Sequence, residues 1–181
     1  ESAQSVGGIG STGAAPANRV ADTADLVIGI GTRYSDFTTA SQTQFKNPGV
    51  RFVNINVQPF DAVKQGAQMV VADAREALRA LAALLADYRV DESYAAEISR
   101  WREQWDVEVE ACYHRGNQPL PAQTEIFGAL NDLMGDDDIV INAAGSMPGD
   151  LQALWRARNP RQYHVEYAFS CMGYEIAGGL G

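Results

Sequence analysis

The chain has 181 residues, of which 46% are hydrophobic, and a formal net charge of -9 at neutral pH. This composition is typical of a globular protein with a buried core, and no apolar run approaches the ~20 residues that a membrane span needs. The 14 basic residues are scattered among 23 acidic ones, so the charge argues against a nucleic acid partner.

The first ninety residues alternate helix and strand patterns. Apolar residues at helical spacing predict a helix in "TGAAPANRVADTAD", and "DAREALRALAALLADY" predicts another that is capped by Asp73. Strands are predicted at Asp25–Gly31, Val50–Val57 and Gln68–Asp73, the first of them a continuous apolar run of the buried type. Strands separated by helices favour a parallel sheet, so residues 1–90 are predicted to form most of a doubly wound, Rossmann-like α/β domain.

A long helix and a second α/β unit follow. An apolar stripe at three- and four-residue spacing predicts the helix and consists of Tyr94, Ile98, Trp101, Trp105, Val109 and Cys112. The segment "PAQTEIFGALNDLMG" predicts a new helix, with Pro121 near its first turn and Gly135 past its end. A strand in "DIVINAAG", a helix in "MPGDLQALWRA", a strand in "QYHVEY" and a last helix come next. We therefore assign residues 91–120 to a linking helix and loop, and residues 121–181 to the start of a second α/β domain.

Two glycine-containing loops in the first half are weaker candidates for ligand binding. The segment Gly8–Gly13, "GIGSTG", has the spacing of a dinucleotide fingerprint, but no apolar strand precedes it, which favours a flexible loop. The segment Gly29–Thr39 is better placed, because it follows the carboxyl end of a predicted strand, where open α/β sheets bind ligands. Arg33 in this loop could hold an anion or could pair with Asp36.

The remaining polar groups give no clear metal or catalytic constellation. Asp136–Asp138 precede a strand and so lie at its amino end, which favours a solvated turn over a metal site. His114 and His164 have no partner at ligand spacing, and we interpret both as structural. Glu166 and Glu175 flank the final loop, either as a carboxylate pair or as ordinary solvated or salt-bridged side chains.

The two cysteines, Cys112 and Cys171, lie far apart and form no CxxC pair. Such usage fits a reducing compartment, and the N-terminal residues show no signal-peptide pattern, so we expect a cytoplasmic protein. The first residue is not Met, and we expect the sequence to be a piece of a longer protein.

Two loops of the second unit form the strongest candidate site. The stretch "INAAGSMPGD" leaves a strand and enters a helix near Pro148, where free backbone N–H groups and the helix dipole would attract a phosphate. The stretch "FSCMGYEIAGGLG" follows the next strand in the same way, and Met172 could support a bent organic cofactor. Because the carboxyl ends of neighbouring parallel strands meet at one edge, the two loops are predicted to enclose one pocket. Ordinary helix–sheet packing would also account for the glycines.

A family resemblance is carried by "STGAAPANRVADTADLVIGIGTRYSDFTT", "VRFVNINVQPFDAVK", "INAAGSMPGDLQALW" and "YHVEYAFSCMGYEIAGGLG". These stretches are similar to the middle and carboxyl-terminal domains of the acetolactate synthase-like thiamine diphosphate enzymes. Within that superfamily, "RYSDFTTAS", "NAAGSMPGDLQ" and "EYAFSCMGYEIAGG" most resemble the trihydroxycyclohexane-1,2-dione hydrolases of myo-inositol degradation. The resemblance implies hydrolytic cleavage of a carbon–carbon bond in a small cyclic diketone, which yields 5-deoxy-glucuronate. It also implies a homodimer or homotetramer in the full-length enzyme.

The resemblance implies thiamine diphosphate and Mg²⁺ as cofactors. The cofactor-binding residues that it implies are Ala144, Gly145, Ser146 and Met147 near the diphosphate, and Ser170, Cys171, Met172 and Gly173 around the aminopyrimidine. Within the second group, the backbone carbonyl of Ser170 would accept the aminopyrimidine's amino group, and Met172 would hold the cofactor's bent shape. The activating glutamate and the Mg²⁺ ligands would lie outside this sequence, so no catalytic or metal residue is assigned and the isolated chain is expected to be inactive.

Two departures from the synthase pattern argue against FAD. Ile9, Gly10 and Ser11 stand where synthases carry a Met-His-Gly stretch, and Asn56 stands where an acidic residue is common. We therefore expect the central domain to serve as a scaffold without flavin. An acetolactate synthase or related pyruvate carboligase is the first alternative function, and a non-catalytic nucleotide-binding module built on Gly8–Gly13 is the second.

Overall fold

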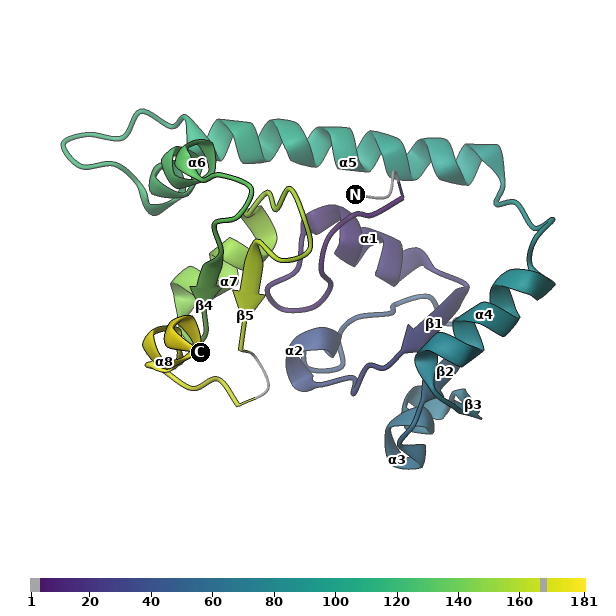
Figure 1. Ribbon diagram of the computed structural model, residues 1–181. Helices are drawn as coiled ribbons and strands as arrows, with labels where there is room; N and C mark the ends of the chain where they lie inside the picture. The colour runs from purple at the N-terminus through teal and green to yellow at the C-terminus, as the bar shows by residue number, and fades with distance from the viewer. Residues whose placement is uncertain (1–3, 167–168) are drawn as a thin grey trace. The chain divides into compact units, whose positions relative to one another are not determined.

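The computed structural model describes residues 4–166 and 169–181 (Figure 1). The chain divides into two compact units. The central unit comprises residues 9–11 and 17–97, and the C-terminal unit comprises residues 98–181 with the described part of residues 1–8 and 12–16. The predicted domain boundaries at residues 91 and 121 stay a prediction.

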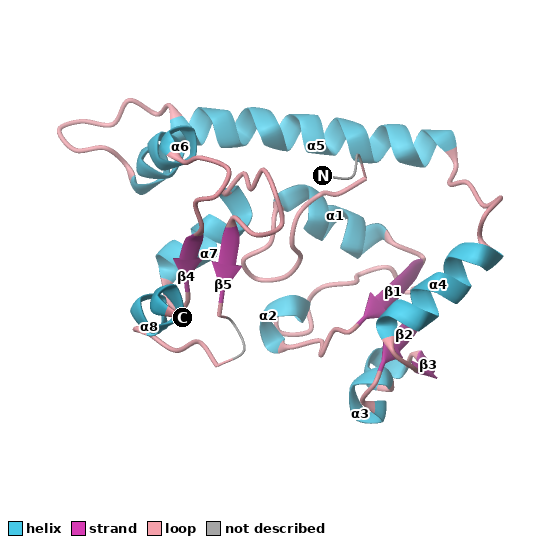
Figure 2. Ribbon diagram, viewed as in Figure 1, coloured by secondary structure: helices cyan, strands magenta, loops and turns pink. Residues whose placement is uncertain are grey.

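The central unit contains a parallel three-stranded sheet in the order β1-β2-β3 (Figure 2). Its strands are β1 (Leu26–Ile30), β2 (Arg51–Asn56) and β3 (Gln68–Val71). The helical segments along the first half of the chain are α1 (Ala15–Thr23), α2 (Asp36–Thr39), α3 (Pro59–Ala62), a short 3₁₀ turn (Lys64–Gly66) and α4 (Ala74–Leu84). The predicted α/β class with a parallel sheet is confirmed. The predicted cap is also present, because the side chain of Asp73 accepts hydrogen bonds from the backbone N–H groups of Arg75 and Glu76.

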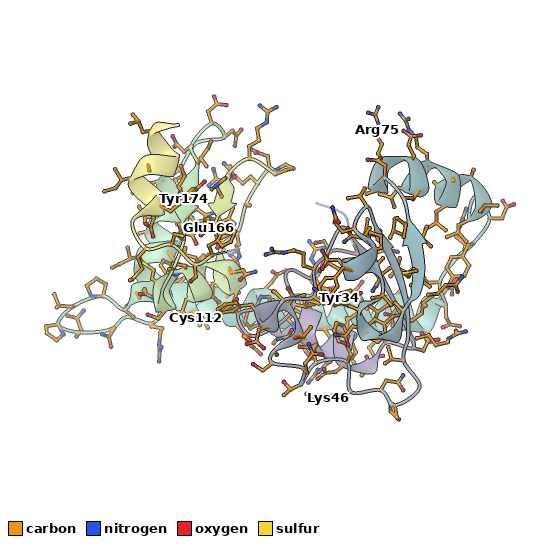
Figure 3. The ribbon with its side chains drawn as sticks, turned by 90° about the horizontal axis from the view of Figure 1, so that it is seen from below. Tyr34, Lys46, Arg75, Cys112, Glu166 and Tyr174 are labelled. Atoms are coloured by element: carbon orange, nitrogen blue, oxygen red, sulfur yellow. The ribbon has the colours of Figure 1, made fainter. Side chains whose placement is uncertain are left out.

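Tyr34 fills the space at the carboxyl end of β1 (Figure 3). Tyr34 is 6% exposed, and its hydroxyl donates a hydrogen bond of 2.7 Å to Oδ1 of the buried Asn54. Gly29 makes this contact possible, since a Cβ atom at that position would lie 2.2 Å from the Tyr34 hydroxyl oxygen. Burial raises the pKa of Tyr34 to about 12, so the hydroxyl remains a donor at neutral pH.

Strand β1 is less buried than its apolar run predicts. Leu26, Ile28 and Ile30 are 42%, 43% and 39% exposed, because they share the face of the strand opposite Gly29. In the part of the chain that the structure describes, other segments cover that face of β1 only partly. The prediction of a fully buried strand was therefore wrong for these residues.

The C-terminal unit packs helices around a two-stranded parallel sheet. Its elements are α5 (Glu92–Tyr113, whose first six residues lie in the central unit), α6 (Gln123–Leu133), β4 (Val140–Asn142), α7 (Ser146–Leu154), β5 (Tyr163–Val165) and α8 (Tyr174–Leu180). The buried core consists of Val109, Tyr113, Phe127 and Leu151. Gly128 lets α6 approach α5 closely, because a Cβ atom there would lie 2.8 Å from Cβ of Tyr113. No helix among the described residues has the length and apolar character needed to cross a membrane.

We expect Tyr34→Phe to destabilise the full chain by about 1–3 kcal/mol, because the variant removes the hydrogen-bond donor for the buried Oδ1 of Asn54. Tyr88→Phe is the matched control, since the Tyr88 side chain is 63% exposed. Urea denaturation measures the free energy of unfolding of both variants. Equal stabilities would show that the Tyr34 hydroxyl contributes nothing to the fold.

Candidate functional site

The parallel pairing of β4 with β5 brings the two predicted loops to the same edge of the sheet (Figure 1). Asn142 pairs with Val165 at the carboxyl ends of the strands, and the Glu166 N–H donates to the Asn142 carbonyl at 3.1 Å. The side chain of Asn142, which is buried, donates to the His164 carbonyl and so links the strands a second time. The structure therefore places both strand ends side by side, as the sequence predicts.

The first loop ends in a backbone conformation that requires glycine. Gly145 has a φ of 120° and a ψ of -177°, a region in which a side chain is strained, and it is the N-cap residue of α7. Ser146 and Met147 open the helix, and Pro148 has no N–H to offer. Neither the N–H of Ser146 nor that of Met147 meets an acceptor among the described residues. The loop thus presents two backbone donors at the positive end of a helix dipole.

A pocket of about 440 Å³ lies beside this loop. It is lined by mostly apolar residues of α6, β4 and α7, by the predicted residues Ala144, Gly145, Ser146 and Met147, and by Glu175. Ser170, Cys171, Met172 and Gly173 are not part of its lining. The structure therefore brings together the four residues of the first loop, and it links the second loop to the pocket through Glu175.

Two glutamates hold the second loop. The Glu166 carboxylate accepts hydrogen bonds from the N–H groups of Phe169 and Cys171, at 2.9 and 3.0 Å. The Glu175 carboxylate accepts from the N–H of Gly173 at 3.0 Å. Neither expectation for this pair describes them fully, because both side chains brace the backbone of the loop that they flank. Residue 167, the last of the predicted strand "QYHVEY", and residue 168 lie outside the described residues.

The described side chains from Phe169 to Gly173 are exposed. Ser170 has a φ of 53°, in the left-handed region, and Gly173 has a φ of 90° as the N-cap residue of α8. Met172 is 87% exposed, and Cys171 is also exposed. The structure thus leaves the Met172 side chain open to a ligand or to another segment.

His164 connects β5 to the start of α8. Its Nε2 lies 2.7 Å from the Tyr174 hydroxyl oxygen, and the two rings stack with centroids 5.6 Å apart. Gly178 leaves room for the tyrosine, since a Cβ atom there would lie 2.7 Å from the ring. This histidine is therefore part of the scaffold of the second loop, in agreement with its structural interpretation.

The glycine loop at Gly8–Gly13 has little free backbone near its centre. The N–H of Gly10 donates to the side chain of Asn18 at 2.7 Å, and the N–H of Ser11 donates to the Phe37 carbonyl at 2.8 Å. A Cβ atom on Gly10 would lie 1.9 Å from that same carbonyl oxygen. Close packing against α2 (Asp36–Thr39) thus explains the central glycine without a ligand.

The other polar candidates make local contacts or none. Arg33 is exposed and forms no ion pair with Asp36, whose carboxylate accepts from the Ser41 hydroxyl. Asp138 accepts from the Gly135 N–H in the turn before β4, at the amino end of the strand. His114 lies 3.2 Å from the carboxylate of Glu110 on α5. In the portion of the chain described by the structure, no group of three or more potential metal ligands is present.

Sequence reasoning missed the bracing role of Glu166 and Glu175. A glutamate next to a glycine-containing loop carries only a weak signal, because the N–H donors that reach its carboxylate depend on the loop conformation. The position of Glu166 directly after a strand that ends at the candidate site was the one feature that could have pointed to this role.

The sequence is similar to several known proteins. Residues 1–81 match the family model described as thiamine pyrophosphate enzyme, central domain. Over 200 residues, which cover 97% of the chain, the sequence is 44% identical to a 3D-(3,5/4)-trihydroxycyclohexane-1,2-dione hydrolase of Bacillus cereus (strain AH820). Over 202 residues it is 45% identical to the protein of the same name from Bacillus thuringiensis (strain Al Hakam).

The family model thus matches the first part of the chain, and the two relatives align with 97% of it. The chain spans about 31% of the length of these relatives. Their shared name describes a hydrolase of a cyclic dione, in agreement with the resemblance seen in the sequence.

We expect Gly145→Ala to lower the free energy of unfolding by about 1–3 kcal/mol, because alanine is strained at the φ of 120° that this residue adopts. Gly135→Ala is the control, since a Cβ atom there would make an ordinary contact of 3.6 Å with Asp138. Denaturant titration of the full chain compares the two variants. An alanine at residue 145 that costs no more than one at residue 135 would contradict the described loop conformation.

Proposed function

We propose that the full-length protein is a thiamine diphosphate-dependent hydrolase that cleaves a carbon–carbon bond in a cyclic 1,2-dione of inositol catabolism. The relatives that share 44–45% identity over 97% of the chain support the substrate class by their name. The observation that carries the proposal is the meeting of two loops at one sheet edge, one with free donors and the other with a free acceptor.

The donors of the first loop suit a diphosphate. The N–H groups of Ser146 and Met147 lie at the amino end of α7, where the helix dipole favours negative charge. The exposed Ser146 hydroxyl adds a third donor. Gly145 contributes no side chain, so an anion can approach the backbone closely.

The second loop suits the other end of the cofactor. No described residue donates a hydrogen bond to the Ser170 carbonyl, which leaves this acceptor available to the amino group of an aminopyrimidine. The exposed Met172 side chain offers a polarizable apolar surface for the bent cofactor. When bound, thiamine diphosphate supplies a nucleophilic carbon that attacks a carbonyl group of the substrate.

Several properties of the full-length enzyme follow from the family and remain part of the proposal. Mg²⁺ would accompany the diphosphate, with ligands from outside residues 1–181. The substrate would be a small diketone, with no role for nucleic acid or a membrane. We further propose a cytoplasmic homodimer or homotetramer.

We propose that the central unit is a scaffold without bound FAD. Both polar groups of the Asn56 side chain are engaged, since its nitrogen donates to the Thr32 carbonyl and its oxygen accepts from the Gln58 N–H, each at 3.0 Å. Asn56 is only 7% exposed, and Tyr34 occupies the carboxyl end of the neighbouring strand. These contacts support a crevice closed by the protein's own side chains.

We expect the full-length enzyme, supplied with thiamine diphosphate and Mg²⁺, to hydrolyse trihydroxycyclohexane-1,2-dione and to leave pyruvate unchanged. Product formation from each substrate, followed by chromatography, tests both the hydrolase and the carboligase alternative. Turnover of pyruvate without turnover of the dione would reject the proposed hydrolase activity.

We expect Met172→Ala in the full-length enzyme to reduce turnover of the dione at least tenfold, because the bent cofactor would lose its apolar support. The fold should be unaffected, since the side chain is 87% exposed. Leu133→Ala removes a side chain of similar size and exposure, at 82%, and should retain full turnover. Steady-state rates and thermal unfolding are measured together, and normal turnover by Met172→Ala would remove this residue from the site.

A further inference from the structure

Glu166 makes contacts that the proposed cofactor interactions leave unexplained (Figure 3). Its two carboxylate oxygens accept from the N–H groups of Phe169 and Cys171, the residues on either side of Ser170. Hydrogen bonds to an ionised group are stronger than neutral ones. They therefore stabilise the left-handed backbone of Ser170, whose φ of 53° is uncommon for a residue other than glycine.

The bond to Cys171 also fixes the direction of the Ser170 carbonyl. The C=O of Ser170 and the N–H of Cys171 belong to one planar peptide group, and in a trans peptide they point in opposite directions. Because the N–H points to Oε2 of Glu166 at 3.0 Å, the carbonyl points away from that carboxylate. No donor in the described ranges reaches it, so the carbonyl is directed and unpartnered.

The sheet anchors the backbone of Glu166. Its backbone N–H donates to the Asn142 carbonyl at the end of β4, and its side chain reaches along the loop. At the far end of the loop, the contact between His164 and Tyr174 ties the start of α8 to β5. A group anchored in regular structure holds a binding geometry more tightly than one carried by a loop alone.

We propose that Glu166 is a positioning residue that aims the Ser170 carbonyl at an amino group of the bound ligand. This inference rests on the proposed function, in which that ligand is thiamine diphosphate and the amino group belongs to its pyrimidine ring. Glu166 acts through the peptide between Ser170 and Cys171.

The test compares two ligands on the full-length enzyme in the presence of Mg²⁺. The first is thiamine diphosphate, and the second is its analogue with oxygen in place of the pyrimidine amino group. Glu166→Gln keeps one acceptor oxygen of the two, so one of the two loop N–H groups loses its partner. Calorimetry should show about tenfold weaker binding of thiamine diphosphate to this variant and unchanged binding of the analogue, which has no amino group to donate.

Two further variants complete the design. Glu76→Gln removes the same charge from an exposed position on α4, and it should bind both ligands as the wild type does. Glu166→Asp keeps two acceptor oxygens on a shorter stem and should show a smaller loss for thiamine diphosphate alone. If thermal unfolding shows that Glu166→Gln does not fold, the affinities of Glu166→Asp for the two ligands test the inference instead.

Each outcome separates the inference from the proposed function. Unchanged affinity of the Glu166 variants for thiamine diphosphate would overturn the inference alone. An equal loss for both ligands would also overturn it, because Glu166 would then have a merely structural role. A wild-type enzyme that binds neither ligand would overturn the proposed function, and this inference with it.

Discussion

The parallel pairing of β4 with β5 is the constraint on which the candidate site depends. Asn142 lies opposite Val165, and the next backbone bond joins the N–H of Glu166 to the Asn142 carbonyl. Since both strands run in the same direction, both following loops must leave at one edge. An antiparallel pair would have placed the two loops at opposite edges, and their donors and acceptor could not have served one ligand.

Backbone groups rather than long side chains define this edge. Each loop ends at a glycine with positive φ, Gly145 before α7 and Gly173 before α8. The glycines turn the chain into the helices, and the N–H groups of Ser146 and Met147 and the carbonyl of Ser170 have no partner among the described residues. The side chains that do matter, Glu166 and Glu175, act on the loop backbone.

The sequence predicted the regular elements and the loops well, because hydrophobic periodicity and capping residues are local signals. Asp73 caps α4 as expected, and β1 to β5 follow the predicted order, whereas the short helices α2 and α3 were not predicted. The exposure of Leu26 on β1 depends instead on which segments cover the sheet, and a strand's own sequence does not contain that information. Likewise, the burial of Tyr34 depends on its own positive φ, and the hydrogen bonds of Glu166 to the loop depend on the positive φ of Ser170. The amino-acid composition does not reveal either value. The family resemblance supplied the site residues, whereas the structure supplied the contacts between them.

The charge behind the second loop has an electronic consequence. A carboxylate that accepts the Cys171 N–H polarises that peptide group, because hydrogen bonds in a chain reinforce one another. Electron density shifts toward the oxygen of Ser170, so this oxygen becomes a more basic acceptor than an ordinary amide carbonyl. In the proposed site, the glutamate would therefore tune the strength of the acceptor as well as its direction.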